Sequence, residues 1–133
     1  MSAEFFDTNV LLYLASNDKD RANRAEALVV AGGTISVQVL NEVANASRRK
    51  LKLSWGEART LLGTLKTVLD VVPVTVEIHE HGLALAEKHG FSTYDAMIVA
   101  AALLNSCETL WSEDMHHGMV VEGKLRIVNP FRE

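Results

Sequence analysis

Acidic side chains recur in four separated parts of the sequence, where they could act together on a cation. They are Asp7, Glu42, Asp95 and the pair Glu113–Asp114. Asp7 interrupts an apolar stretch, and a carboxylate there is costly unless its charge is compensated. Carboxylates gathered in one place raise one another's pKa values unless a cation neutralises them. Oxygen ligands of this kind suit Mg²⁺, with Mn²⁺ as a substitute, and Mg²⁺ commonly keeps waters and substrate phosphates in its shell.

Each acidic residue also has an ordinary structural explanation when it is taken alone. Asp7 could be a helix N-cap, and Asp95 could complete a capping box with Ser92. Asp114 could be a turn residue. Glu42 belongs to a polar stripe at helical spacing that also contains Gln38, Asn45 and Arg49. The metal-site hypothesis therefore depends on whether the fold brings the four positions together.

The elements that would position these residues alternate between short apolar runs and longer amphipathic ones. Strands are expected over 4–6, 34–35, 71–74, 109–111 and 125–128. Helices are expected over 10–15, from the turn at 17–20 to the glycines at 32–33, and over 36–51, 54–69, 75–89 and 92–104. This alternation predicts one α/β domain over residues 1–133, with a central parallel sheet of about five short strands and helices on both faces. Ligands of such sheets gather beyond the carboxyl ends of the strands, where Asp7 and the 113–114 pair would lie.

Composition sets broad limits on the class of protein. The chain has 133 residues, 48% of them hydrophobic, and a formal charge of −4, which argues against coating nucleic acid by charge alone. No apolar run approaches the ~20 residues of a membrane span. A single cysteine, Cys107, cannot form an internal disulfide, so a cytoplasmic location is expected.

Four motifs together resemble a known family. FFDTNVLLY, SVQVLNEV, STYDAMIVAAA and LWSEDMHHG occur in this order, and the chain is similar to the PIN-domain ribonucleases, above all the VapC-type toxins of bacterial toxin–antitoxin pairs. By this resemblance the acidic quartet is Asp7, Glu42, Asp95 and Asp114, and its polar neighbours are Thr8, Asn9 and Ser112. Ser112 lies two residues before Asp114, which favours Asp114 over Glu113 as the fourth acidic residue.

The resemblance implies an endoribonuclease that depends on Mg²⁺ and cleaves RNA by activating a water. Asp7 and Asp95 would hold the metal, while Glu42 and Asp114 would bind it or a second ion, or would orient the water. The resemblance also implies a homodimer and an antitoxin partner whose segment covers the acidic cleft. One alternative is a catalytically silent PIN-like domain that binds RNA or protein. Another is a phosphohydrolase with Asp7 as nucleophile, but haloacid-dehalogenase enzymes carry a second Asp where this chain has Asn9.

A dense basic run, 48–52, follows the helix that contains Glu42. Positive charges near a helix carboxyl end are favourable in themselves. The same run could also contact an RNA backbone. The sequence leaves both interpretations open.

Overall fold

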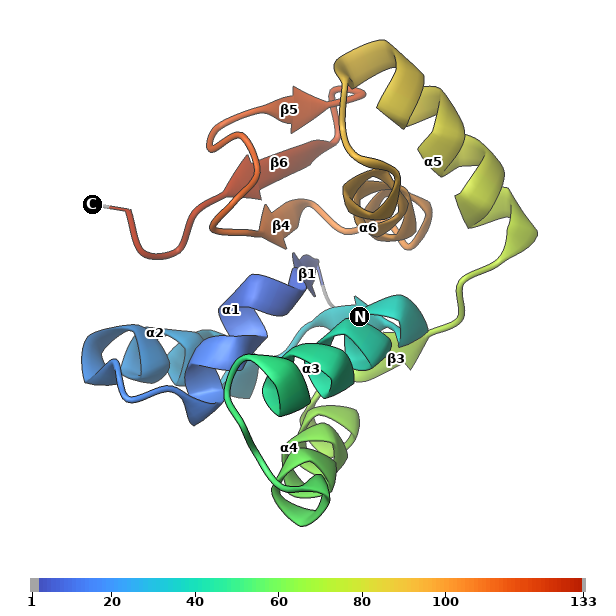
Figure 1. The fold of residues 1–133 in the computed structure, drawn as a ribbon. Coiled ribbons are helices and arrows are strands. Elements are labelled where there is room, and N and C mark those ends of the chain that lie inside the picture. The colour runs from blue at the N-terminus through green and yellow to red at the C-terminus, as the bar shows by residue number, and fades with distance from the viewer. Residues whose placement is uncertain (1–2, 133) are drawn as a thin grey trace.

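The computed structural model describes residues 3–132, which build a six-stranded sheet with helices packed around it (Figure 1). The strand order is β3-β2-β1-β4-β6-β5, and every pairing is parallel except that of β5 with β6. The strands are β1 (Glu4–Phe6), β2 (Thr34–Ser36), β3 (Asp70–Val72), β4 (Thr109–Trp111), β5 (Val120–Val121) and β6 (Leu125–Val128). The predicted α/β class with a central, mostly parallel sheet is confirmed.

The helices follow the strands as parallel crossovers. They are α1 (Thr8–Leu12), continued by the 3₁₀ turn η1 (Tyr13–Ala15), then α2 (Lys19–Val30), α3 (Val37–Arg49), α4 (Trp55–Val68), α5 (Val76–His89) and α6 (Thr93–Leu104). Right-handed crossovers place the helices between β1, β2 and β3 on one face of the sheet, and the return from β3 to β4 places α5 and α6 on the other. In Figure 1, α5 and α6 pack together, away from α2 and α4. No helix within 3–132 is long and apolar enough to cross a bilayer.

Besides shifts of one or two residues at the ends of other elements, three features differ from the prediction. The first helix begins at Thr8 rather than at residue 10 and tightens into a 3₁₀ turn from Tyr13. The third strand runs over Asp70–Val72 instead of 71–74, since Pro73 has no N–H to donate to a ladder. The short antiparallel strand β5 was not predicted, because two residues are too few to show a period.

The register of the two central strands places the first acidic residue. Phe6 of β1 pairs with Trp111 of β4, and the Asp7 N–H donates to the Trp111 carbonyl at 2.9 Å. Phe5 and Phe6 are completely buried, so their burial fixes the position at which the strand ends. Asp7 and Ser112 consequently leave the sheet side by side at its carboxyl edge.

Candidate active site

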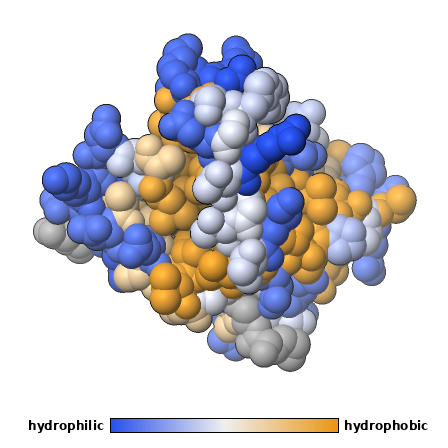
Figure 2. All heavy atoms as spheres, turned by 90° about the horizontal axis from the view of Figure 1, so that it is seen from below, coloured by the Kyte–Doolittle hydropathy of each residue, from blue (hydrophilic) through white to orange (hydrophobic). Residues whose placement is uncertain are grey.

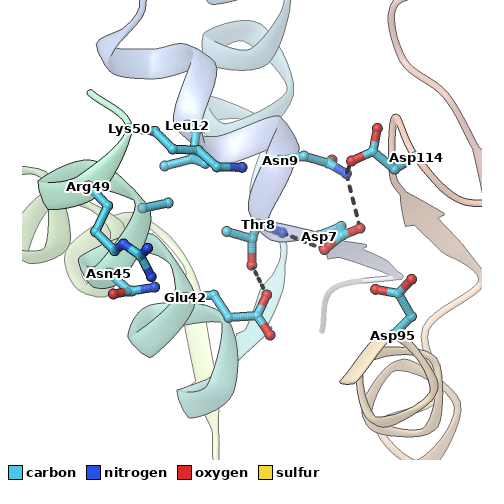
Figure 3. A pocket seen from close by; sticks show the side chains of 11 residues that line it. Asp7, Thr8, Asn9, Leu12, Glu42, Asn45, Arg49, Lys50, Asp95 and Asp114 are labelled. Carbon is cyan, nitrogen blue, oxygen red and sulfur yellow. Dashed lines mark hydrogen bonds between the residues drawn. The ribbon is translucent and has the colours of Figure 1, made fainter. Parts of the chain in front are cut away.

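An open pocket of about 560 Å³ lies beyond the carboxyl ends of β1 and β4. Its walls come from the start of α1, one face of α3, the start of α6 and the loop after β4 (Figure 3). The lining residues are Asp7, Thr8, Asn9, Leu12, Glu42, Asn45, Ala46, Arg49, Lys50, Asp95 and Asp114. The fold therefore brings the four acidic positions of the expected quartet around one space.

Asp7 is the most deeply placed of these carboxylates, with 5% of its surface exposed. It is the N-cap of α1, and one carboxylate oxygen accepts the Thr8 N–H at 2.7 Å. The other oxygen accepts the Ser112 hydroxyl at 2.8 Å and the Asn9 amide at 3.3 Å. Asp7 is thus both a helix cap, as one interpretation expected, and a member of the acidic pocket.

Burial dominates the electrostatics of Asp7. The pKa of Asp7 is raised from 3.8 to about 6, and removal from water is the largest cause, while the hydrogen bonds from Ser112 and Thr8 act in the opposite direction. The nearby carboxylates of Asp95 and Glu42 make a smaller contribution to this rise. The metal-free site therefore holds a carboxylate that the fold disfavours in its charged form.

Glu42 enters the pocket from α3 and is oriented by two donors. The Thr8 hydroxyl donates to one of its oxygens at 2.7 Å, and the Gln38 amide donates to the other at 2.8 Å. Gln38 also donates to the Tyr94 carbonyl at 3.0 Å, which links α3 to the start of α6. The polar stripe of α3 therefore faces the acidic pocket and not solvent alone.

Asp95 lies in the first turn of α6, where the buried body of the helix fixes its direction. Ser92 caps this helix by accepting the Asp95 N–H at 3.2 Å, while the Asp95 carboxylate lines the pocket. Burial raises the pKa of Asp95, the Ser92 hydroxyl lowers it, and the charges of Glu42 and Asp114 raise it again. The capping role of Ser92 and a functional role of Asp95 are therefore compatible.

The loop after β4 separates the roles of its two acidic residues. Asp114 lines the pocket and accepts the Asn9 amide at 3.0 Å. Glu113 instead accepts the Tyr13 hydroxyl at 2.7 Å and lies 3.4 Å from the Arg21 guanidinium. The geometry therefore favours Asp114 as the fourth carboxylate of the pocket.

The donor set fits a hard divalent cation, although the carboxylates stand apart around the pocket. Across residues 3–132, no three His, Cys, Asp or Glu side chains are close enough to enclose an ion as they stand. The four acidic side chains that line the pocket nevertheless offer oxygen ligands, and burial together with the neighbouring carboxylates raises the pKa values of Asp7 and Asp95. A cation of the Mg²⁺ class would relieve both the burial cost and the mutual repulsion.

The structure adds one charged residue to the pocket beside the apolar Leu12 and Ala46. Lys50 lines the pocket beside Arg49, which the sequence had placed in line with Glu42. The signal for Lys50 was its place in the basic run, but the run alone did not show which members face the acidic residues.

Comparisons with known proteins agree with this geometry. The family model described as the PIN domain matches residues 5–118. No curated protein sequence matches the chain.

Solved structures share the fold over 84–98% of the chain. A toxin–antitoxin complex from Klebsiella pneumoniae superposes with a TM-score of 0.75 at 22% identity, covering 98% of this chain and 99% of the other. VapC20 of Mycobacterium tuberculosis, a sarcin–ricin loop cleaving toxin, gives 0.70 at 22% identity, covering 84% and 89%. DNA-bound VapBC from Salmonella typhimurium gives 0.71 at 18% identity, covering 96% and 97%. With the family model spanning the four acidic positions, the chain belongs to the PIN domain family.

Proposed function

We propose that this protein is a metal-dependent endoribonuclease of the VapC type, the toxin of a toxin–antitoxin pair. The observation that carries the proposal is the convergence of four carboxylates, from four separate elements, on one open pocket. Asp7 in particular is buried, and its pKa is raised to about 6. Membership of the PIN domain family and the structural likeness to VapC toxins support the assignment to nuclease chemistry.

Asp7 and Asp95 are the residues that would hold Mg²⁺ or Mn²⁺, with Glu42 and Asp114 as further ligands. When bound there, such an ion would supply Lewis-acid chemistry, polarising a substrate phosphate and lowering the pKa of a water. Asp7 and Asp95 are assigned the direct role because the fold raises the pKa values of both carboxyl groups, so a cation would stabilise their charged forms.

The polar neighbours position these carboxylates. Ser112 and Asn9 both donate to one oxygen of Asp7, which leaves its second oxygen held by the Thr8 N–H. Asn9 also donates to Asp114 and so couples two carboxylates that lie more than a hundred residues apart in sequence. The Thr8 hydroxyl donates to Glu42 and so orients that carboxylate. Hydrogen-bond partners of this kind orient the residues that bind a metal and fix their protonation states.

An open pocket suits a polymeric substrate, because a chain can cross it without having to enter a closed cavity. The substrate proposed here is RNA, and the support for it is the family and the cleaving toxin among the structural neighbours. The catalytically silent alternative would keep the pocket but show no specific divalent site.

The test is cleavage of RNA by purified protein with Mg²⁺ or Mn²⁺, with EDTA and with Asp7→Asn. Cleavage should require the metal and should collapse in Asp7→Asn. Asp70→Asn is the matched control, since Asp70 is an exposed carboxylate at the amino end of β3, away from the pocket. Cleavage that persists in EDTA, or equally in Asp7→Asn, would contradict the proposal.

An antitoxin is the protein partner that we propose, supported by the toxin–antitoxin complexes among the neighbours. A second, more apolar groove of about 610 Å³ lies between α2 and α4, lined by Leu14, Val29, Val30, Leu53, Leu61 and Val68 among others. Figure 2 views the molecule from the side of α4 and shows hydrophobic residues gathered on this face, with hydrophilic residues at its margins. An amphipathic segment of a partner would cover such a surface. Co-purification with the product of a small neighbouring reading frame would test the pairing.

A further inference from the structure

Two basic side chains close one side of the acidic pocket. Arg49 and Lys50 lie at the carboxyl end of α3 and line the same space as the four carboxylates. In Figure 3, Lys50 extends past Leu12 toward Asn9, while Arg49 lies beside Asn45. The pocket therefore has an acidic wall and a basic margin.

These two cations are not neutralised by the carboxylates that they face. Among the described residues, the ion pairs are made by Arg21 and His81, and none involves Arg49 or Lys50. Both side chains are exposed, so an anion from solution can reach them. A pocket with four carboxylates would otherwise repel a phosphate chain.

Their distance along α3 indicates which part of a substrate they would meet. Glu42 and Arg49 are seven residues apart on one face of the helix, which is about 10 Å along its axis. Figure 3 places Arg49 and Lys50 on the side of the pocket opposite Asp95 and Asp114, so a phosphate at those two carboxylates is not the one that they would meet first. A flexible backbone passing over the acidic wall would instead present a neighbouring phosphate to the basic margin.

The other members of the basic run behave differently, which separates its two interpretations. Arg48 donates to the Leu53 carbonyl at 2.8 Å, and its guanidinium lies 4.4 Å from the centre of the Trp55 ring. Arg48 therefore holds the turn between α3 and α4. Lys52 is exposed but does not line the pocket.

We propose that Arg49 and Lys50 form a subsite for the RNA backbone, binding a phosphate next to the one that is cleaved. This assignment rests on the function proposed above and extends it to the path of the substrate. It predicts that the strand crosses the pocket from the acidic wall toward the carboxyl end of α3. Arg49 and Lys50 are substrate-binding residues in this proposal, and they contact the RNA away from the reacting phosphate.

The experiment measures binding of a fluorescein-labelled oligouridylate in EDTA, where the metal-dependent reaction does not interfere. Each phosphate contact on a single strand contributes about 0.7 to the slope of log K against log salt, so losing two contacts flattens the slope by about 1.4. Arg49→Gln/Lys50→Gln should consequently bind about 25-fold more weakly near 0.1 M salt and about equally near 1 M. The matched control is Arg59→Gln/Lys66→Gln, which removes the same charge from exposed positions on α4. The charge-conserving pair Arg49→Lys/Lys50→Arg should restore the wild-type slope.

The outcomes distinguish this inference from the proposed function. An unchanged slope in Arg49→Gln/Lys50→Gln, or an equal change in the control, would overturn the subsite even if wild type cleaves RNA with Mg²⁺. A lower melting temperature with an unchanged slope would reduce Arg49 and Lys50 to charges that stabilise the end of α3. A flattened slope without any metal-dependent cleavage would keep Arg49 and Lys50 as an RNA-backbone site but would remove the nuclease proposal and, with it, the placement of that site beside a cleaved phosphate.

Discussion

Replacing Asp7 by Asn should make the metal-free protein more stable at neutral pH, although it removes a helix cap of the preferred kind. Asn caps helices about as well as Asp, so the capping contribution changes little. What changes is the charge. The native fold raises the pKa of Asp7 from 3.8 to about 6, and a tenfold change in proton affinity corresponds to about 1.4 kcal/mol. The ionised side chain therefore costs the native state about 3 kcal/mol.

The sign of the pH dependence follows from the same shift. The native state binds the Asp7 proton more tightly than the unfolded chain does, so its stabilising contribution is complete below about pH 4. That contribution is lost as the pH rises through about 6. The Asp7→Asn variant has no titrating group at this position, so the position contributes equally to the free energy of unfolding at every pH in this range.

Hydrogen bonding reduces the expected gain. The Asn carbonyl can still accept the Thr8 N–H, but its amide group would replace the oxygen that accepts from Ser112 and Asn9. Losing such bonds costs about 1–1.5 kcal/mol. A net gain of about 1–2 kcal/mol near pH 7.5 is therefore expected, roughly 3–8 °C in melting temperature for a domain of this size.

Urea and thermal unfolding in EDTA between pH 4 and 8 would measure this effect. Wild type should lose stability relative to Asp7→Asn as the pH rises, and Asp70→Asn should follow wild type. Saturating Mg²⁺ should then reverse the order, because a ligand at 100 times its Kd stabilises the native state by ~2.7 kcal/mol. Parallel pH curves for wild type and Asp7→Asn, with the mutant less stable throughout, would refute the reasoning from burial.

Four further outcomes are expected. Asp114→Asn should abolish most RNA cleavage whereas Glu113→Gln should retain it, because only the first side chain lines the pocket; equal losses in a cleavage assay would contradict this division. Gly33→Ala should destabilise the fold by about 1–3 kcal/mol in urea unfolding, since a Cβ there would collide with the buried Phe6 ring, and an unchanged midpoint would show that the ring can move. The Mg²⁺ concentration that gives half-maximal stabilisation should rise roughly tenfold from pH 7.5 to pH 5, where only about a tenth of Asp7 is ionised; a constant midpoint would mean that Asp7 does not bind the ion. Sedimentation at micromolar concentration should show a homodimer, and monomer alone would count against it.

Local rules predicted most of the framework. Ser36, Ser54 and Ser92 each cap the helix that was expected to follow them, and Ser54 forms its capping box with Glu57. Gly90 ends α5 in the left-handed conformation that glycine adopts without strain. These features depend on neighbours within a few residues, which is why the sequence reveals them.

Features that depend on distant partners could not be read in the same way. Strand β5 exists because Val120 and Val121 pair with β6 across a tight turn at Glu122 and Gly123. Its two residues carry no periodic signal of their own. The sheet order, which sets Asp7 beside Ser112, likewise comes from pairing between segments that are about a hundred residues apart.

The candidate site shows the same division. The sequence indicated the acidic positions, but the directions of Glu113 and Asp114 depend on Tyr13 and Asn9, from another part of the chain. The sequence also could not show which residues of the basic run face the pocket, since the contact of Arg48 with the Trp55 ring depends on the conformation of the α3–α4 turn. Side-chain direction in loops and at helix ends is set by packing, which composition does not encode.

A second aspartate in the same chain shows why capping alone does not explain Asp7. Asp18 is the N-cap of α2 and accepts the Arg21 N–H at 3.1 Å. That hydrogen bond lowers the pKa of Asp18 at its exposed position, as expected for a carboxylate whose charge the helix end favours. Asp7 occupies the same kind of position, yet burial and the charges of Asp95 and Glu42 raise its pKa to about 6. A cap could have been supplied at the surface without this cost, so the burial of Asp7 among other carboxylates is better explained by a cation that offsets it.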